Sequence, residues 1–109
     1  MNIIAKGTLL YYINQYPAAK TALLTWYYAF SGAMFKNFNE LKVMYGNASL
    51  VTGSRVIFNI KGNDYRLVTA VNFRQKAAYI IWFGTHKEYD NINTATIHFD
   101  SSILNDKSK

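Results

Sequence analysis

The stretch from Asn59 to Asp90 decides the fold that this chain is expected to adopt. It begins with Asn59-Ile60-Lys61-Gly62-Asn63-Asp64-Tyr65-Arg66-Leu67-Val68 and ends with Gly84-Thr85-His86-Lys87-Glu88-Tyr89-Asp90. Two apolar runs, 67–73 and 77–83, lie between these segments, and a polar turn separates them. Apolar runs bounded by turn residues are typical of β-strands. The stretch therefore predicts a sheet with basic side chains near its start and a loop carrying His and Tyr at its end.

Helical spacing replaces strand-like spacing on the N-terminal side of this stretch. Residues 55–60 are β-branched and aromatic and predict one more strand. Further back, apolar residues recur at three- and four-residue steps. They predict one helix from Thr8, as its N-cap, to about Gln15, and a second from Pro17 to about Phe30.

A short third helix is predicted over residues 36–42, where Asn37 and Glu40 have the spacing of a capping box. Residues 1–5 could form an edge strand or an arm, and residues 94–99 a further strand or a docked tail. The order of the elements predicts an α+β fold. In it, two N-terminal helices and the short third helix pack on an antiparallel β-sheet.

Length and composition indicate a single globular domain. The chain has 109 residues, of which half are hydrophobic and 17% are charged. We expect one domain over residues 1–99 with a modest core, and a polar tail over residues 100–109 that frays. Aromatic residues also make up 17%, more than so small a core readily hides, so some rings should be partly exposed.

The positive charge is concentrated in the folded body. The net charge is +6, and residues 1–83 contain nine Lys and Arg against two acidic residues. Residues 84–109 contain three Lys against four acidic residues. A basic body suggests a polyanionic partner, either nucleic acid or an acidic protein. A general role in solubility is the alternative explanation of the same charge.

The absence of cysteine excludes disulfides, thiolate metal sites and thiol nucleophiles. The first residues lack the basic segment and the long apolar segment of a signal peptide. No apolar run approaches the ~20 residues that a membrane span needs. We therefore expect a cytoplasmic protein that does not associate with membranes.

His86 and Tyr89 are the chemically versatile residues after the last apolar run. A histidine can carry a proton near neutral pH, and a tyrosine three residues later could donate to, or align, the same phosphate. The alternative is a structural loop, in which the histidine bonds to the backbone and the tyrosine covers the sheet edge.

Lys61 and Arg66 flank the predicted turn before the first long apolar run. Arg66 offers a forked donor suited to phosphate, and Lys61 offers a mobile positive charge. A solvated basic turn is the alternative explanation for Lys61. Alternation along a strand places Arg66 on the face opposite Leu67 and Val71, so Arg66 needs a partner or a ligand outside that face.

Other chemistries lack the residues that they require. Gly62 and Gly84 are isolated and form no phosphate-binding glycine loop. His86 and His98 have no cysteines or paired carboxylates near them in the sequence, so no metal site is predicted. Acidic residues are too sparse for a two-metal nuclease. A nuclease with this sequence would work without metal, and no cofactor is expected.

The chain resembles the HigB-type mRNA-interferase toxins of bacterial toxin–antitoxin modules, within the RelE/ParE superfamily. The resemblance covers about residues 1–97, in the family's order and spacing. The matching segments are Thr8-Leu9, Ala22-Leu23-Leu24-x-Trp26-Tyr27, Lys36-Asn37-Phe38-Asn39-Glu40-Leu41-Lys42, Arg55-Val56-Ile57-Phe58-Asn59-Ile60-Lys61-Gly62-Asn63-x-Tyr65-Arg66-Leu67-Val68, and Gly84-Thr85-His86-x-Glu88-Tyr89-Asp90.

This resemblance implies a RelE-like fold and a toxin that inhibits translation and growth. The implied activity is a metal-independent endoribonuclease that cuts mRNA on the translating ribosome. The implied partner is a helix-turn-helix antitoxin of the HigA type, which neutralises the toxin in a complex that could be of higher order.

The resemblance also implies roles for individual side chains. His86 would transfer protons, Arg66 and Lys61 would stabilise the charged phosphate, and Tyr89 would orient or stack on the RNA. Further RNA contacts are expected from cationic, amide and aromatic side chains, namely Lys36, Asn37, Asn59, Asn63, Tyr65 and Lys87.

Ile81 departs from the family pattern, which usually has an arginine at this point of the third strand. The missing cation leaves a second hypothesis open, a catalytically weak or inactive module that binds RNA or its antitoxin without cleavage. A third hypothesis is that the protein poisons a DNA-processing enzyme, as ParE-type relatives do. It is the weaker one, because the matched segments are those of the RNase branch.

Overall fold

The computed structural model of the chain describes residues 1–4 and 6–98 and confirms the α+β class. Its helices are α1 (Lys6–Gln15), α2 (Lys20–Ser31), α3 (Phe38–Met44) and α4 (His86–Tyr89), and a 3₁₀ turn, η1, spans Pro17–Ala19. Its strands are β1 (Asn2–Ile4), β2 (Ser49–Leu50), β3 (Arg55–Ile60), β4 (Tyr65–Asn72) and β5 (Ala77–Thr85). The three long strands lie where the apolar runs predict them.

The strands form one five-stranded sheet in the order β1-β5-β4-β3-β2. Strands β2 to β5 pair antiparallel, as expected, whereas β1 lies parallel to β5, with Ile3 opposite Ala78. The sheet is therefore mixed, and β1 is the edge strand that residues 1–5 suggested. Parallel pairing is possible here because the N-terminal helices separate β1 from the rest of the sheet in the chain.

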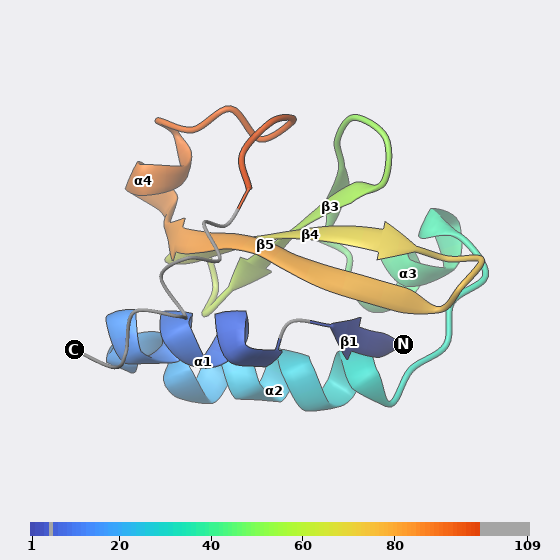
Figure 1. Ribbon diagram of the computed structural model, residues 1–109, viewed down its shortest axis with the longest axis horizontal. Helices are drawn as coiled ribbons and strands as arrows, with labels where there is room; N and C mark the ends of the chain where they lie inside the picture. Colours follow the sequence, from blue (N-terminus) through green and yellow to red (C-terminus); the bar gives the residue numbers. More distant parts are fainter. Residues whose placement is uncertain (5, 99–109) are drawn as a thin grey trace.

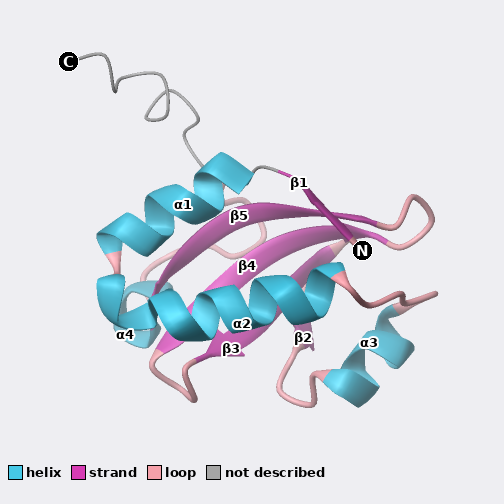
Figure 2. Ribbon diagram, turned by 90° about the horizontal axis from the view of Figure 1, so that it is seen from below, coloured by secondary structure: helices cyan, strands magenta, loops and turns pink. Residues whose placement is uncertain are grey.

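Helices α1 and α2 cover one face of the sheet (Figure 1). Seen from that side, α2 crosses in front of the strands and α1 lies alongside β5 (Figure 2). The core between the two layers contains Leu23 and Phe30 from α2, with Phe58, Leu67 and Phe83 from the strands. Burial of each such side chain stabilises the fold by about 1.5–3 kcal/mol relative to an exposed one. This packing holds the sheet as a rigid platform for the residues on its other face.

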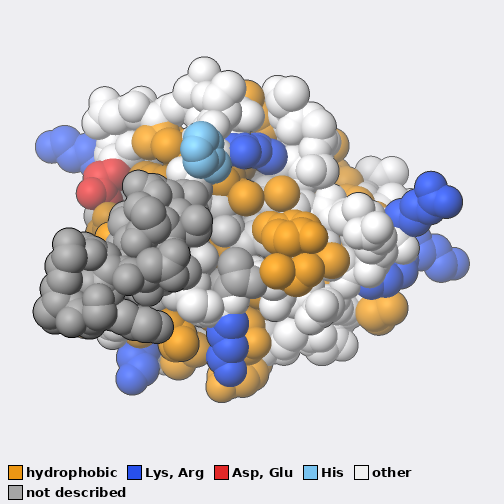
Figure 3. Space-filling model, viewed as in Figure 1, with side chains coloured by type: hydrophobic (Ala, Val, Ile, Leu, Met, Phe, Trp, Pro, Cys, Tyr) orange, Lys and Arg blue, Asp and Glu red, His pale blue; other side chains and the backbone are white. Residues whose placement is uncertain are grey.

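The opposite face of the sheet, called the open face below, carries α4 and the segment 90–98 but no long helix (Figure 1). Its residues alternate with the core residues along β3, β4 and β5. Ile57 and Val68 are buried there, whereas Tyr79 is 41% exposed. Hydrophobic side chains form a visible patch over the middle of β4 and β5 (Figure 3).

A β-bulge interrupts the pairing of β4 with β5. Val68 lies opposite Trp82, but the next residue of β4, Thr69, lies opposite Ile80. Ile81 is therefore the extra residue of β5, at the position where the resembled family usually has an arginine. Bulges bend a strand and change the direction of neighbouring side chains.

Three local predictions need correction. Thr8 is not an N-cap, because α1 already includes Lys6 and Thr8 is a buried residue within it. Pro17 opens η1 rather than the second helix, which begins at Lys20. The predicted loop 84–90 instead completes β5 and then forms the helical turn α4.

The segment after α4 docks on the sheet without forming a strand over 94–98. Arg55 Nη1 donates to the carbonyl oxygens of Thr94, at 2.9 Å, and of Ile97. These contacts favour the docked tail over the further strand. Phe99 and the predicted frayed tail, 100–109, lie outside the described residues.

The N-cap of α3 confirms the predicted spacing of Asn37 and Glu40. Asn37 Oδ1 accepts a hydrogen bond from the backbone N–H of Glu40 at 3.0 Å, and Glu40 Oε1 accepts one from the backbone of Lys36 at 2.7 Å. Replacing Asn37 with alanine should lower the free energy of unfolding by about 0.5–2 kcal/mol in urea titrations. Asn37→Ser, which can still cap, should retain most of it. Equal loss in both variants would contradict a capping role.

Candidate active site

One end of the sheet brings together most of the predicted site residues. Asn59 lies opposite Arg66, and Arg66 lies opposite Gly84, so the three form a row across β3, β4 and β5. The row belongs to the open face, because Leu67 and Phe83, their neighbours in sequence, lie in the core. The alternation that predicted Arg66 to point away from Leu67 and Val71 is thus confirmed.

Arg66 is held at its guanidinium by the adjoining turn. Its Nη1 donates to the carbonyl oxygens of Asn63, at 3.1 Å, and of Tyr65, at 3.2 Å. Its Cζ lies 6.0 Å from the centroid of the Tyr89 ring, at the outer limit for a cation–π contact. Arg66 forms no ion pair within the described residues. It is therefore an oriented cation whose charge is free to act on an anion.

The turn between β3 and β4 carries two further predicted residues, Lys61 and Asn63, and Arg66 donates to the carbonyl oxygen of Asn63. Lys61 is exposed and has a positive φ of 55°, followed by Gly62 with φ 64°, which gives the tight reversal between the strands. Asn59 Nδ2 donates to Asn63 Oδ1 at 3.2 Å across the mouth of this turn. The turn is closed by a hydrogen bond from the backbone N–H of Asp64 to the carbonyl oxygen of Lys61, at 3.2 Å.

Helix α4 sits against this turn. The backbone N–H of His86 donates to the Asp64 carbonyl at 2.9 Å, which joins the start of α4 to the β3–β4 turn. Thr85 and Glu88 form a capping box around the first turn. The Thr-x-x-Glu spacing was readable in the sequence and signals a helix start. His86, Lys87 and Tyr89 are thus presented by a capped helical turn.

His86 has an acidic neighbour that sequence reasoning missed. Its Nδ1 lies 3.5 Å from Asp90 Oδ2, one helical turn later, and the two side chains are 50% and 61% exposed. A carboxylate at Nδ1 orients an imidazole and leaves Nε2 available to a substrate. The i, i+4 spacing was the only sequence signal for this pair, and it became meaningful once the segment was helical.

Trp82 also lies in this group. A Cβ atom on Gly84 would lie 2.5 Å from Trp82 Cη2, so the indole ring covers the backbone of Gly84. The ring centroids of Trp82 and Tyr89 are 6.4 Å apart. Gly84 is therefore required by the close approach of the indole, and the two rings together line the site next to Arg66.

Glu88 ties α4 to the helix layer on the other face. Its Oε1 accepts hydrogen bonds from the Tyr16 hydroxyl, at 2.7 Å, and from the Thr85 backbone, at 2.8 Å. The backbone bond from Thr85, and next the Tyr16 hydroxyl, hold the pKa of Glu88 below its usual value. Burial, and then the bond to Glu88, raises the pKa of Tyr16. The contact joins residues that are 72 positions apart.

Tyr16→Phe should therefore destabilise the fold in a pH-dependent way. A carboxylate with a lowered pKa contributes stability above its ordinary pKa of 4.5, and this contribution is lost as the pH falls through the lowered value. At pH 7 we expect a loss of roughly 0.5–1.5 kcal/mol, discounted for the exposure of Glu88. The difference from wild type should shrink below pH 4.5 in urea titrations. A difference that does not depend on pH would contradict this account.

Three predicted RNA contacts lie outside this group. Tyr65 lies on the helix side of the sheet, where it stacks on Phe83 with ring centroids 5.3 Å apart. Lys36 and Asn37 precede α3, at the opposite end of the sheet from α4 (Figure 1). The structure thus gathers Lys61, Arg66, His86 and Tyr89 with Asn59, Asn63 and Lys87, and it separates Lys36, Asn37 and Tyr65 from them.

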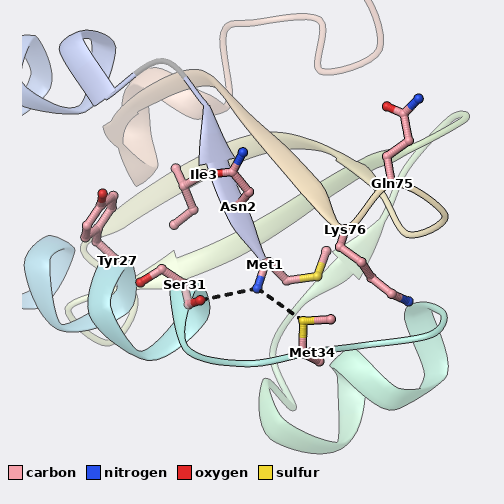
Figure 4. A pocket seen from close by; sticks show the side chains of 8 residues that line it. All are labelled: Met1, Asn2, Ile3, Tyr27, Ser31, Met34, Gln75 and Lys76. Atoms are coloured by element: carbon pink, nitrogen blue, oxygen red, sulfur yellow. Dashed lines mark hydrogen bonds between the residues drawn. The ribbon is translucent and has the colours of Figure 1, made fainter.

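One cavity of the molecule lies apart from this group. A cavity of about 480 Å³ lies between β1, α2 and the β4–β5 turn, with Met1, Tyr27, Met34 and Lys76 in its lining (Figure 4). There the N-terminal amine donates to the Ser31 carbonyl at 3.3 Å. The turn residues in its lining belong to the far ends of β4 and β5 from Arg66 and His86, so this cavity is separate from the candidate site.

Over residues 1–4 and 6–98, no three or more His, Cys, Asp or Glu side chains gather as they would around a metal ion. In the same part of the chain, no helix has the length and apolar character needed to cross a membrane.

Comparison with known proteins identifies the family. The sequence model of the family described as "HigB_toxin, RelE-like toxic component of a toxin-antitoxin system" matches residues 19–92. The chain is 30% identical to the mRNA interferase toxin HigB of Escherichia coli strain K12 over 92 residues, covering 83% of this chain and 88% of the relative. The mRNA interferases HigB of Escherichia coli O157:H7 and Shigella flexneri match with the same identity and coverage. With this match over most of its length, and with the RelE-like arrangement of its sheet and helices, the chain belongs to the HigB family of toxins from toxin–antitoxin systems.

Proposed function

We propose that this HigB-family protein is a metal-independent endoribonuclease that cleaves mRNA. The observation that carries the proposal is the grouping of Arg66, His86 and Tyr89 at one end of the open face. It combines a cation without an acidic partner, a proton-transfer group and an aromatic ring. The names of its relatives, mRNA interferases, support the same activity.

The chemistry that suits this group is an internal displacement at phosphorus. The ribose 2′-oxygen attacks the adjacent phosphorus and gives up its proton, and the bond from phosphorus to the 5′-oxygen breaks. The leaving 5′-oxygen takes a proton. The products are a 2′,3′-cyclic phosphate and a free 5′-hydroxyl. His86 would transfer a proton in this reaction, and Arg66 and Lys61 would stabilise the extra negative charge on the phosphorane. Tyr89 would orient the RNA, by stacking on a base or by aligning Arg66.

The setting of the proposed activity is the translating ribosome in the cytoplasm. Cleavage there would inhibit translation and growth. A helix-turn-helix antitoxin of the HigA type would neutralise the protein, in a complex that could contain more than one copy of each chain. The basic body suits both RNA and an acidic segment of an antitoxin.

Primer extension on cellular mRNA after brief induction tests the proposal. We expect discrete cuts that keep a constant position within codons and that are absent in His86→Ala. Cuts scattered without regard to the reading frame would contradict action on the ribosome. A DNA-damage response without mRNA cuts would instead favour the poisoning of a DNA-processing enzyme.

The binding module without cleavage is the second candidate, and Ile81 is the observation that favours it. This half-buried residue occupies the bulge of β5 where the family usually has an arginine. If the wild type binds RNA but makes no cuts, this candidate becomes the better one. Appearance of cuts in Ile81→Arg would then assign the defect to the missing cation.

A further inference from the structure

Tyr79 is an exposed aromatic residue on the open face, near the start of β5. Its side chain is 41% exposed, although it lies in β5 between the buried residues Ala78 and Ile80. The register places it opposite Ala70 of β4 on one side and Ile4 of β1 on the other. Both neighbours are small or aliphatic and half-buried, so the ring of Tyr79 is larger and more exposed than the side chains on either side of it.

The surroundings of Tyr79 are positive rather than acidic. Arg55 lies in the same row, opposite Ala70, and its guanidinium donates to the carbonyl oxygens of Thr94 and Ile97. Arg74 is exposed in the turn that joins β4 to β5. Across the described residues, the one ion pair is that of His86 with Asp90, so no described acidic side chain pairs with either arginine. Lys and Arg side chains surround the hydrophobic patch in the space-filling view (Figure 3).

Tyr79 shares its face and its strand with the candidate active site. It precedes Gly84 by five positions along β5, which corresponds to roughly 15 Å. An extended RNA strand covers this distance in a few nucleotides. Between the two positions lies Trp82, whose ring lies beside that of Tyr89. Tyr79 and Trp82 therefore lie on the same face of the sheet as Arg66, with Trp82 between Tyr79 and the candidate active site along β5.

We propose that Tyr79 is a base-stacking subsite for single-stranded RNA, a few nucleotides from the phosphate that Arg66 holds. This inference rests on the proposed function. Proteins that bind single strands combine a positive path for phosphates with aromatic rings that take the bases. Sheets that read RNA stack bases on aromatic residues in the middle of their strands. The two arginines, which pair with no described acidic side chain, favour a polyanion over an apolar protein segment as the occupant of this face.

The test uses RNA oligonucleotides that the intact protein cannot cleave, because the 2′-hydroxyl at the mapped cut site is removed. A 2-aminopurine base is placed at successive positions away from that site. We expect its fluorescence to be quenched at one position a few nucleotides away, where it stacks on Tyr79. In Tyr79→Thr, which removes the ring but places a residue that favours strands at this position, quenching should disappear and affinity should fall about fivefold to 150-fold.

Matched variants separate stacking from other effects. Tyr79→Phe keeps the ring and should bind RNA as the wild type does. Tyr28→Thr removes a tyrosine that is 69% exposed on α2, in the helix layer, and should also leave RNA binding unchanged. Thermal melting of each variant checks that the fold is retained.

Three results would overturn the inference. Wild-type affinity and quenching in Tyr79→Thr would remove the subsite, while mRNA cuts in cells would leave the proposed function intact. Weaker binding of an antitoxin, with RNA binding unchanged, would assign this face to a protein partner. No binding of the wild type to any of these oligonucleotides would also overturn the inference, while mRNA cuts in cells would again leave the proposed function intact.

Discussion

Replacing His86 with alanine should lower the rate of RNA cleavage by about 10²–10⁴-fold, the usual contribution of a positioned acid or base. The imidazole lies on the capped turn α4, with Nδ1 facing Asp90 at 3.5 Å. Its loss removes proton transfer but little packing, because the side chain is half exposed. The measurement is single-turnover cleavage of an mRNA bound to programmed ribosomes, with substrate saturating so that binding does not limit the rate.

His98→Ala is the matched control for this prediction. His98 is exposed, and its Nδ1 lies 3.3 Å from the Thr96 carbonyl oxygen. Its replacement should leave the rate unchanged. Asp90→Asn should have a smaller effect than His86→Ala, because it changes the orientation of the imidazole without removing it. Full activity in His86→Ala would show that protons move without this side chain and would leave the cations as the main source of catalysis.

Arg66→Ala should lower the cleavage rate by about 10²–10³-fold, as expected when one preorganised donor to a developing charge is lost. Two carbonyl oxygens, of Asn63 and Tyr65, already hold the guanidinium, so little reorganisation is needed when the phosphorane forms. Arg66→Lys keeps the charge but loses the planar fork and these paired contacts. It should recover only part of the rate.

Lys20→Ala is the control for general electrostatics. Lys20 is exposed at the start of α2, in the helix layer, and its loss changes the net charge by the same amount as Arg66→Ala. It should leave the rate close to that of the wild type. If both variants lose activity equally, the effect of Arg66 lies in the overall field and not in a contact with phosphate. Urea titrations would measure the free energy of unfolding of Arg66→Ala. They would show whether loss of the contacts with the turn destabilises the fold, separately from the loss of catalysis.

The local predictions from sequence succeeded where one short pattern controls the structure. The β-branched and aromatic run 55–60 is a strand with the predicted bounds, and the Asn37–Glu40 spacing is a helix cap. The same kind of reasoning was wrong at Thr8, because helix start signals compete with burial and this threonine is part of the packed face of α1. The loop predicted over residues 84–90 is also wrong, because the Thr85–Glu88 capping box starts helix α4 there.

The sequence by itself determined the α+β class, the family resemblance and the face of Arg66, because periodicity and caps depend on residues a few positions apart. Only the tertiary structure decided that β1 pairs parallel with β5 and that Tyr79 stays exposed. It also decided that Tyr65 stacks on Phe83, on the side of the sheet that the helices cover. The bond from Tyr16 to Glu88 likewise joins distant segments. Such contacts depend on strand register and on the packing of one layer against another, which no local pattern specifies.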